Sequence, residues 1–426
     1  INLINENYEE IIFDSFLKGI EIRLPKPYNK KADETLHLNG IITLAENNRI
    51  RYRTRYGGHL DSLIEYNSST LGDGSNNHLR GEIRFGTGVA VLPAQPGLRL
   101  VGELDELKID IWKSLFDQFE VKTNTSPSKL SSAQRSGKAA IRQNSMTLVH
   151  SADVTVKKFS AWGQHAENLH LIVKNSEKGL SAILDSKAIK GQVDIPVDLD
   201  SNPIIMDFDY INLDSDEEDV GGGAVDPRDF PSFLARSNSV TYKDKNFGKV
   251  DLSITKLTEG IRIEKLSMKS NATVITANGS WLWLNGKSKS NFNFRLESSN
   301  LGASMVGLGY KDSIEGGFGT VDVKLNWPGG LTEFEVDQLS GEVHFSLAEG
   351  QLLEYDPLGK ASILGLFSIQ TLPRRLFLDF SDLVDKGLSF DSITGDVNIE
   401  DGDAYTNNFK MQGPVIGAAL AGRVGL

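Results

Sequence analysis

The chain has 426 residues, which exceeds the size at which one hydrophobic core usually stops growing, so a single compact domain is not expected. It carries 45 basic and 57 acidic side chains, and its net charge of −12 argues against a nucleic-acid-binding surface over the whole chain. Because cysteine is absent, disulfide frameworks, cysteine zinc sites, iron–sulfur clusters and a thiol nucleophile are excluded. No apolar stretch approaches the roughly 18 residues that a membrane-spanning helix needs. The chain begins without the basic and apolar regions of a signal peptide, so we expect any signal or anchor to lie upstream.

Strict alternation of apolar and polar residues is the main secondary-structure signal. It occurs at 291–297, 321–327, 343–347 and 376–380, where the apolar residues share one parity. A period of two is typical of strands with one buried face. The sequence therefore predicts a mainly β fold with largely antiparallel strands.

A short pattern recurs along the chain: aliphatic, any, Gly, any, aliphatic, any, apolar. It occurs at 38–44, 79–85, 189–195, 339–345, 393–399 and 420–426, with a looser copy at 277–283. The glycine shares the parity of the apolar residues, so the inward face lacks a side chain there. Either the glycine permits a bulge or sheet curvature, or it widens a groove for a ligand. A second glycine follows after seven residues at Gly88, Gly286 and Gly402, which predicts a hairpin turn.

Three helices are expected between the strands. The first is predicted near 110–120, the second at 299–308 with Leu301, Met305 and Val306 on one face, and the third at 357–372. The third has a broad apolar stripe, so it either plugs against a sheet or lies on a membrane surface, and plugging is favoured. We expect the first two helices to cover a sheet.

Two connecting segments suggest how the chain is divided. Residues 122–138 are rich in Ser and Thr, and residues 214–225 combine a run of acids with three glycines. The acidic run lacks the spacing of an EF-hand loop, so a solvated linker is favoured over a calcium site. The expected organisation is a first β segment at 1–213, a linker at 214–225 and a second β segment at 226–426.

A search for catalytic and cofactor motifs gives no match. There is no His-Glu-x-x-His, the seven histidines are scattered, no Gly-Lys pair completes a phosphate-binding loop, and no Gly-x-Ser-x-Gly occurs. Carboxylate pairs are uninformative among 57 acids. We therefore expect no metal site, no cofactor and no enzymatic activity.

One strand carries a dense basic pattern. Arg49, Arg51, Arg53 and Arg55 alternate with Ile50, Tyr52, Thr54 and Tyr56, which places four guanidinium groups on one face. A solvated outer face with the tyrosines turned inward is the favoured interpretation. The alternative is a weak contact with phosphate, such as a lipid head group.

Several segments carry a resemblance to a known family. They are 96–105, 226–231, 316–329, 364–380, 386–396 and 401–408, and they resemble the YhdP branch of the AsmA-like superfamily over about 36–426. The resemblance implies an elongated, strongly curved antiparallel sheet that forms an apolar groove, with a few short amphipathic helices covering or plugging it. It also implies no catalytic residues.

The function that the resemblance implies is a bridge-like phospholipid carrier of Gram-negative bacteria that supports outer-membrane homeostasis. Such a protein would lie in the periplasm between the inner and outer membranes, tethered by an N-terminal helix that this chain lacks. Its expected partners are phospholipid, the two membranes through parts outside this chain, and envelope proteins, with no nucleic acid. The competing hypotheses are an envelope scaffold that binds partner proteins without lipid, and a hydrolytic enzyme, which the missing motifs disfavour.

The inward parity of the strands supplies the candidate lipid contacts. If the strands form an open groove, these residues line it; if two sheets pack face to face, the same residues form a dry core between them. The residues are Phe292, Phe294, Leu296, Val321, Val323, Leu325, Val343, Phe345, Leu347, Val397 and Ile399.

Overall fold

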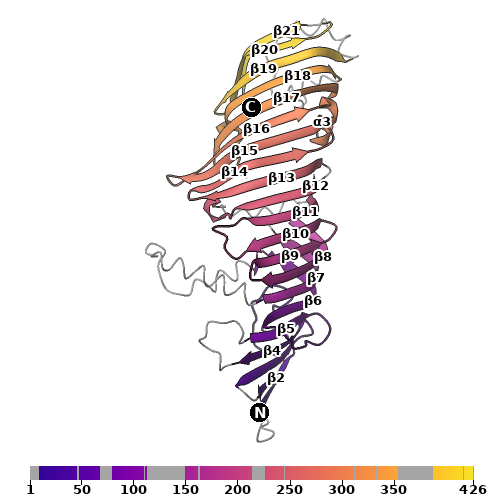
Figure 1. Cartoon of the computed structure of the whole chain (residues 1–426), viewed down its shortest axis with the longest axis vertical. Helices are drawn as coiled ribbons and strands as arrows, with labels where there is room; N and C mark the ends of the chain where they lie inside the picture. Colours follow the sequence, from indigo (N-terminus) through magenta and orange to yellow (C-terminus); the bar gives the residue numbers. More distant parts are fainter. Residues whose placement is uncertain are drawn as a thin grey trace. The chain divides into compact units, whose positions relative to one another are not determined.

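The mainly β fold predicted from the alternation is confirmed (Figure 1). In the described part of the chain, no helix is long and apolar enough to cross a membrane. The computed structural model describes residues 9–45, 48–67, 79–109, 111–112, 149–161, 164–213, 226–243, 245–310, 313–331, 333–353, 387–415 and 417–425.

The chain divides into two units, and the first contains ten strands. Its inner face buries Tyr28, Leu104, Val156 and Leu169, with Trp112 packed against Tyr28. Each strand pairs with the next one along the chain. The strands are β1 (Glu9–Ser15), β2 (Leu38–Ala45), β3 (Arg49–Tyr56), β4 (Leu60–Asn67), β5 (Leu79–Phe85), β6 (Gly97–Lys108), β7 (Val149–Ala161), β8 (Gln164–Ser176), β9 (Gly179–Asp185) and β10 (Ile189–Pro196).

The second unit is one sheet in which each strand pairs with the next, so the alternative of two sheets packed face to face is wrong for its described strands. Its long strands curve (Figure 1). The elements are β11 (Ile204–Leu213), η5 (Pro227–Asp229), β12 (Phe233–Tyr242), β13 (Lys245–Leu257), β14 (Gly260–Lys269), β15 (Thr273–Leu284), β16 (Lys287–Ser298), α3 (Leu301–Gly307), β17 (Ile314–Pro328), η6 (Val336–Gln338), β18 (Ser340–Leu352), β19 (Leu388–Glu400), β20 (Asp403–Gln412) and β21 (Gly417–Gly425).

The boundary between the units differs from the expected one. The second unit begins at Leu199, because β11 pairs in parallel with β12 of that unit. The proposed linker at 214–225 lies outside the described residues, as do 122–138 and 376–380.

Parallel pairing is a feature that the alternation did not predict. Strands β5 and β6, β6 and β7, and β11 and β12 are parallel, so a hairpin joins none of these pairs. The hairpin turn predicted at Gly88 is therefore wrong. The segment from β5 to β6 crosses the sheet instead, and the Ala90 amide donates a hydrogen bond of 2.8 Å to Asp61.

The other two predicted hairpin turns are confirmed. Asn285 and Gly286 have φ angles of 51° and 80° between β15 and β16, and Asp401 and Gly402 have 47° and 80° between β19 and β20. Two successive residues with positive φ are typical of the type I′ turn, whose twist matches that of the strands it joins. These turns fix the registers of the two hairpins.

The space beside several inward glycines is filled by phenylalanine rings. Gly279 is paired directly with Phe292 and Gly395 with Phe345, and each ring lies where a glycine Cβ would be. Phe13 covers Gly40 in the first unit in the same way. The interpretation that these glycines widen a groove for a ligand is therefore wrong. Gly395 also borders an irregularity in the pairing of β19 with β20, which agrees with the bulge interpretation at that position.

The predicted helices have three different outcomes. The helix expected at 299–308 is present as α3, capped by the Asn300 side chain. Near 110–120 only the first residues are described, and Ile111 and Trp112 are helical. The helix predicted at 357–372 lies outside the described residues.

The glycine–phenylalanine pairs generate a stability prediction. A Cβ at residue 395 would lie 2.8 Å from Phe345 Cζ, so we expect Gly395→Ala to lower the free energy of unfolding by about 1–3 kcal/mol. Adding Phe345→Leu removes the clashing ring atom and should make the double variant less unstable than the sum of the single variants. Urea unfolding followed by tryptophan fluorescence measures both effects.

The matched control is Gly422→Ala, because a Cβ at residue 422 meets nothing within 4 Å. We expect it to change the free energy of unfolding by less than about 0.5 kcal/mol. Equal losses for residues 395 and 422 would contradict the ring-packing explanation.

Candidate functional site: an apolar face in the C-terminal unit

The register of the second unit aligns apolar residues from one strand to the next. Residues that are directly opposite each other in paired strands share a face of the sheet. One unbroken row runs across β11–β19 and is called the central row; it comprises Met206, Ala235, Leu252, Leu266, Ala277, Phe294, Val323, Val343 and Val397.

A second row lies beside the central row and crosses all eleven strands from β11 to β21. It contains only apolar residues and glycine, and its two glycines in β15 and β18 do not interrupt the hydrocarbon surface with a polar group. The row comprises Ile204, Phe233, Ile254, Ile263, Gly279, Phe292, Leu325, Gly341, Ile399, Ala404 and Val424.

The register places all eleven predicted lining residues on this apolar face. Leu296, Val321 and Phe345 form part of a third row, and Leu347 pairs with Gly319 and Ile393 in a fourth. That these residues contact lipid stays a prediction. The arrangement does show that they form one continuous surface.

Burial is uneven over the apolar face. Phe292, Phe345, Val397 and Ile399 are buried in the main hydrophobic cluster of the unit. Phe294, Val321, Leu325, Val343 and Leu347 are partly buried against it, and Leu296 and Val323 keep intermediate exposure. Packing within the described residues therefore leaves part of the predicted lining accessible.

Aromatic residues gather along one edge of the apolar face. The Trp327 ring stacks on Phe292 with centroids 5.5 Å apart and meets Phe334 edge-on at the same distance. The indole N–H of Trp327 donates to the Gly330 carbonyl at 2.9 Å, and that of Trp281 donates to Ser288 at 2.6 Å. Because the polar atoms of both indoles are satisfied by the protein, their rings can face hydrocarbon without an unpaired donor.

The helix α3 packs through a polar contact, which differs from the predicted face. It buries Leu301, Gly302 and Ser304, whereas Val306 is 52% exposed. The Ser304 hydroxyl lies 2.7 Å from the hydroxyl oxygens of both Thr273 and Ser298. Leu301 is buried in the hydrophobic cluster as predicted, but Ser304 and not Val306 completes the buried side, because Thr273 and Ser298 offer hydroxyl partners there.

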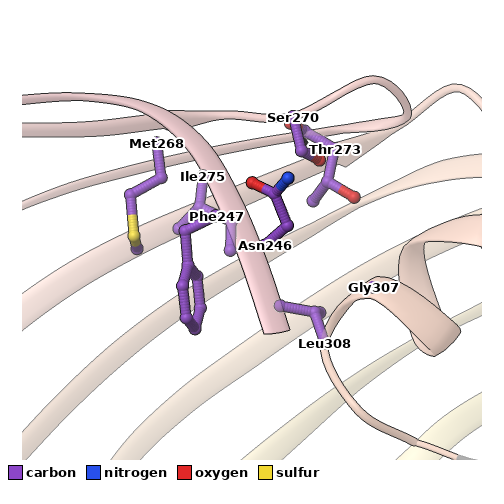
Figure 2. Close-up of a pocket in the computed structure, with 8 residues that line it drawn as sticks. All are labelled: Asn246, Phe247, Met268, Ser270, Thr273, Ile275, Gly307 and Leu308. Carbon is purple, nitrogen blue, oxygen red and sulfur yellow. Dashed lines mark hydrogen bonds between the residues drawn. The ribbon is translucent and has the colours of Figure 1, made fainter. Parts of the chain in front are cut away.

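A small hollow lies between α3 and the neighbouring strands (Figure 2). Its volume of about 10 Å³ is enough for one water molecule at most, so it is not a lipid pocket. Met268 and Ile275 belong to the third row of the apolar face and also line the hollow. The full lining is Asn246, Phe247, Met268, Ser270, Thr273, Ile275, Gly307 and Leu308.

The four arginines of β3 lie in the first unit, on the face opposite Tyr52 and Tyr56, as the alternation predicted. Tyr56 packs in the core of that unit, so the arginines are on its outer face. They are not simply solvated. Arg49 and Arg51 approach Glu65 at 3.8 and 2.8 Å, and Arg53 and Arg55 approach Asp61 at 3.6 and 2.7 Å.

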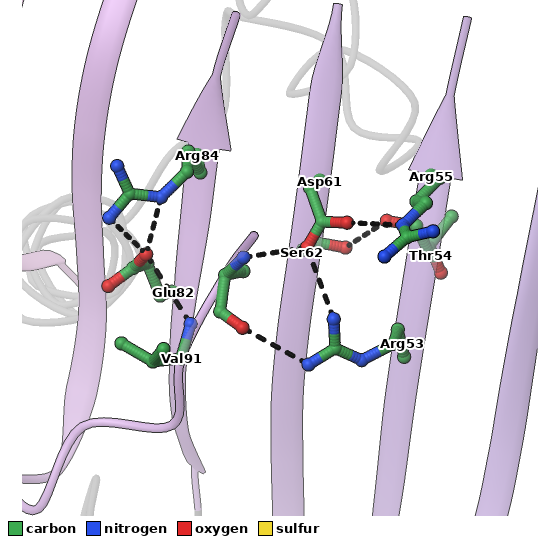
Figure 3. Close-up of polar contacts among 9 residues, drawn as sticks. Arg53, Thr54, Arg55, Asp61, Ser62, Glu82, Arg84 and Val91 are labelled. Carbon is green, nitrogen blue, oxygen red and sulfur yellow. Dashed lines mark hydrogen bonds and ion pairs between the residues drawn. The ribbon is translucent and has the colours of Figure 1, made fainter. Parts of the chain in front are cut away.

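Sequence reasoning missed these carboxylates, whose side chains are almost fully buried. Figure 3 shows Asp61 between Arg53 and Arg55. Burial alone would raise the pKa of Glu65, but hydrogen bonds from Arg51 and Arg80 outweigh it and hold that pKa below its ordinary value. Asp61 also accepts the Ala90 amide, and Arg53 donates to the Ala90 carbonyl at 3.1 Å. One role of the network is therefore to fix the segment that crosses from β5 to β6.

Metal-ligand geometry is not found in the described ranges, where no three His, Asp or Glu side chains converge. His37, His170 and His344 each pair with one aspartate, and these pairs are exposed to solvent. In the second unit, the described residues thus offer hydrocarbon contacts on the apolar face, and the pair of His344 and Asp396 lies on the opposite face.

A single curved sheet with unbroken apolar rows and one short helix, as the described part of the second unit has, is the architecture of the class of β-groove proteins. The sequence profile of the YhdP family, described as YhdP protein, matches residues 1–426, and the chain belongs to this family. It is similar to the intermembrane phospholipid transporter YhdP of Escherichia coli K12, with 25% identity over 199 residues. That alignment covers 47% of this chain and 16% of the relative. No solved structure matches the chain.

The buried carboxylates generate a prediction of pH dependence. Because the pKa of Glu65 is lowered on folding from its ordinary value of 4.5, its contribution to stability is present above about pH 4.5 and is lost as the pH falls through the folded pKa. We expect Glu65→Gln to destabilise the first unit by about 2 kcal/mol at neutral pH and to flatten its loss of stability in acid. Hydrogen exchange of the β4 amides between pH 7 and 3 measures both.

Glu103→Gln is the control, because the Glu103 side chain is 66% exposed and pairs only loosely with Lys157 at 3.7 Å. It should leave the protection of β4 unchanged. An acid profile of Glu65→Gln that matches the unmodified chain would show that Glu65 is not the titrating group.

Proposed function

We propose that this chain is a segment of a phospholipid carrier and that acyl chains lie along the apolar rows of its second unit. The observation that supports this most strongly is the central row, which crosses nine strands without a polar residue. At a strand spacing of ~4.8 Å, the row extends for roughly 38 Å along the sheet. Each leaflet of a bilayer contributes about 15 Å of hydrocarbon, so the row is longer than one acyl chain.

The length of the row favours transfer over storage of one lipid. A pocket that holds a single ligand is closed around it, whereas the row offers equivalent hydrocarbon contacts at successive strands. A lipid that moves by one strand spacing exchanges one set of apolar contacts for a similar set. Movement along the row therefore needs little change in free energy at each step.

The free energy of hydration shows why such a surface accelerates transfer. Exposing two acyl chains to water involves roughly 30 methylenes at about 0.8 kcal/mol each, which is on the order of 24 kcal/mol before any offset. An apolar face replaces most of that exposure. The protein lowers the barrier to transfer in both directions and supplies no net driving force.

The context of the whole protein is part of the proposal, since the aligned segment covers 16% of the curated relative. That relative is named an intermembrane phospholipid transporter. We infer a periplasmic bridge between the inner and outer membranes, tethered through parts of the protein outside this chain, that supports outer-membrane homeostasis. We further infer that it acts without catalysis.

Photocrosslinking in the cell envelope tests the proposal. A photoreactive residue at Phe294, on the apolar face, should give phospholipid adducts that mass spectrometry identifies, whereas the same probe at Asn293 should not. Asn293 lies on the opposite face, where its amide donates to Asn278 at 3.0 Å. Protein adducts without lipid at both positions would support the scaffold hypothesis instead.

A pair of substitutions tests whether the row must be apolar. Phe294→Glu should abolish lipid copurification because a charge interrupts the central row, and Asn293→Glu should leave it unchanged. The combination Val323→Thr and Val343→Thr adds two hydroxyls with little change of volume, so it should reduce bound lipid several-fold even if Phe294→Glu fails to fold. Unchanged lipid content in a folded double-Thr variant would refute the assignment of the row.

A further inference from the structure

The outer face of β3–β6 carries a cluster of arginines held by buried acids, which we call the arginine face. The side chains of Asp61, Glu65 and Glu82 are 6%, 5% and 0% exposed. Each accepts contacts from two or three arginines within 4 Å, including Arg80 on Glu65 and Arg84 and Arg99 on Glu82. The complete set of arginines is Arg49, Arg51, Arg53, Arg55, Arg80, Arg84 and Arg99.

The arginine face has a surplus of positive charge in an acidic chain. Seven guanidinium groups meet three carboxylates, an excess of four positive charges. Glu103 and Asp105 on the same face of β6, which pair with Lys157 of β7, reduce this excess to three, in a chain that carries −12 as a whole. Asp14 and Asp153 also lie on strands of this unit, but they pair with His37 and His170. Glu10 of β1 lies two strands from β3. The positive excess is therefore carried by the arginines of β3–β6.

The buried carboxylates orient the guanidinium groups more than they neutralise them. A guanidinium has five N–H donors in a rigid plane, so a contact with one carboxylate leaves donors that can bind another oxyanion. Arg49, Arg51, Arg55 and Arg99 remain 40–54% exposed while so held. A group that is already ordered loses less conformational freedom on binding a partner. These features are typical of a preformed anion-binding surface.

The spacing of the arginines indicates the shape of the anion. The strand β3 carries an arginine at every second position, so the Cα atoms of successive arginines are roughly 6.6 Å apart. These arginines are Arg49, Arg51, Arg53 and Arg55. An extended peptide with acids at every second position has the same repeat. Arg51 and Arg55 already donate hydrogen bonds to the carboxylates of Glu65 and Asp61, and Figure 3 shows the contact of Arg55 with Asp61.

We propose that the arginine face docks an extended acidic segment of a partner protein, with Asp or Glu at alternate positions. This surface lies opposite the core side of its sheet, so the role is separate from lipid carriage and does not depend on it. The partner's carboxylates would bind the exposed N–H groups of Arg49, Arg51 and Arg55, and the buried Asp61 and Glu65 would keep those groups in place.

The test measures binding of a fluorescent peptide of alternating Glu and Ser to the complete chain by anisotropy, at low and at physiological ionic strength. We expect saturable binding that weakens with salt. The double variant Arg49→Gln and Arg55→Gln should bind at least tenfold more weakly. Arg295→Gln, which removes an exposed arginine paired with Glu297 and Asp322 in the other unit, should bind normally.

Two further comparisons can overturn the proposal. A peptide of the same composition with its acids in one block should bind at least fivefold more weakly, and equal binding would refute the match of spacing. Polyphosphate or vesicles containing phosphatidylglycerol that bind through the same arginines, and more tightly than the peptide, would show that the ligand is a phosphate and not an acidic protein. Hydrogen exchange of β3 and β4 confirms that the double variant is folded, so loss of binding cannot be assigned to unfolding.

Discussion

The register between neighbouring strands is the constraint on which the apolar face depends. Side chains in a strand alternate between faces, so a slip of one residue between β16 and β17 would turn Val323 outward and bring Lys324 into the central row. The rows are continuous only because each pair of strands keeps the same parity relation. The type I′ turns at Asn285–Gly286 and Asp401–Gly402 hold two of these registers locally, without help from distant packing.

The glycine–phenylalanine pairs keep the apolar face free of gaps at the positions of its glycines. A glycine in a strand would normally leave a gap, and here the ring of the paired residue occupies it at Gly279 and Gly395. Ring atoms of Phe292 and Phe345 lie within 2.8 Å of the place that a Cβ of the paired glycine would take. A bulky side chain thereby packs on the apolar face without leaving a gap beside the glycine.

Local patterns in the sequence predicted the features that local geometry controls. The alternation identified the apolar parity of β16–β19, and the Gly spacing identified the turns at Gly286 and Gly402, because both depend on a few consecutive residues. The parallel pairs were not predictable in this way, since they depend on where a crossing segment returns. The buried side of α3 was misassigned because it depends on hydroxyl groups contributed by Thr273 and Ser298.

The carboxylates of the arginine face could have been found from the sequence with one additional step. Only three residues separate Tyr56 from Leu60, so a hairpin there pairs Arg55 with Asp61 and Arg51 with Glu65. The opposite charges then predict cross-strand ion pairs. Their burial was not predictable, because it results from the segment containing Ala90, which crosses the sheet between parallel strands.

The uniformity of the apolar rows has a consequence for the kind of binding they support. A deep pocket concentrates favourable contacts at one position and creates a free-energy minimum from which a ligand leaves slowly. In the central row, most of whose side chains keep intermediate exposure, the residues change from strand to strand between Met, Ala, Leu, Phe and Val, but no polar group marks a preferred stopping point. The hollow beside α3 is too small to create one. A surface of many similar weak sites suits movement of a hydrocarbon chain better than its retention, and this distinguishes the face from an enzyme pocket or a storage cavity.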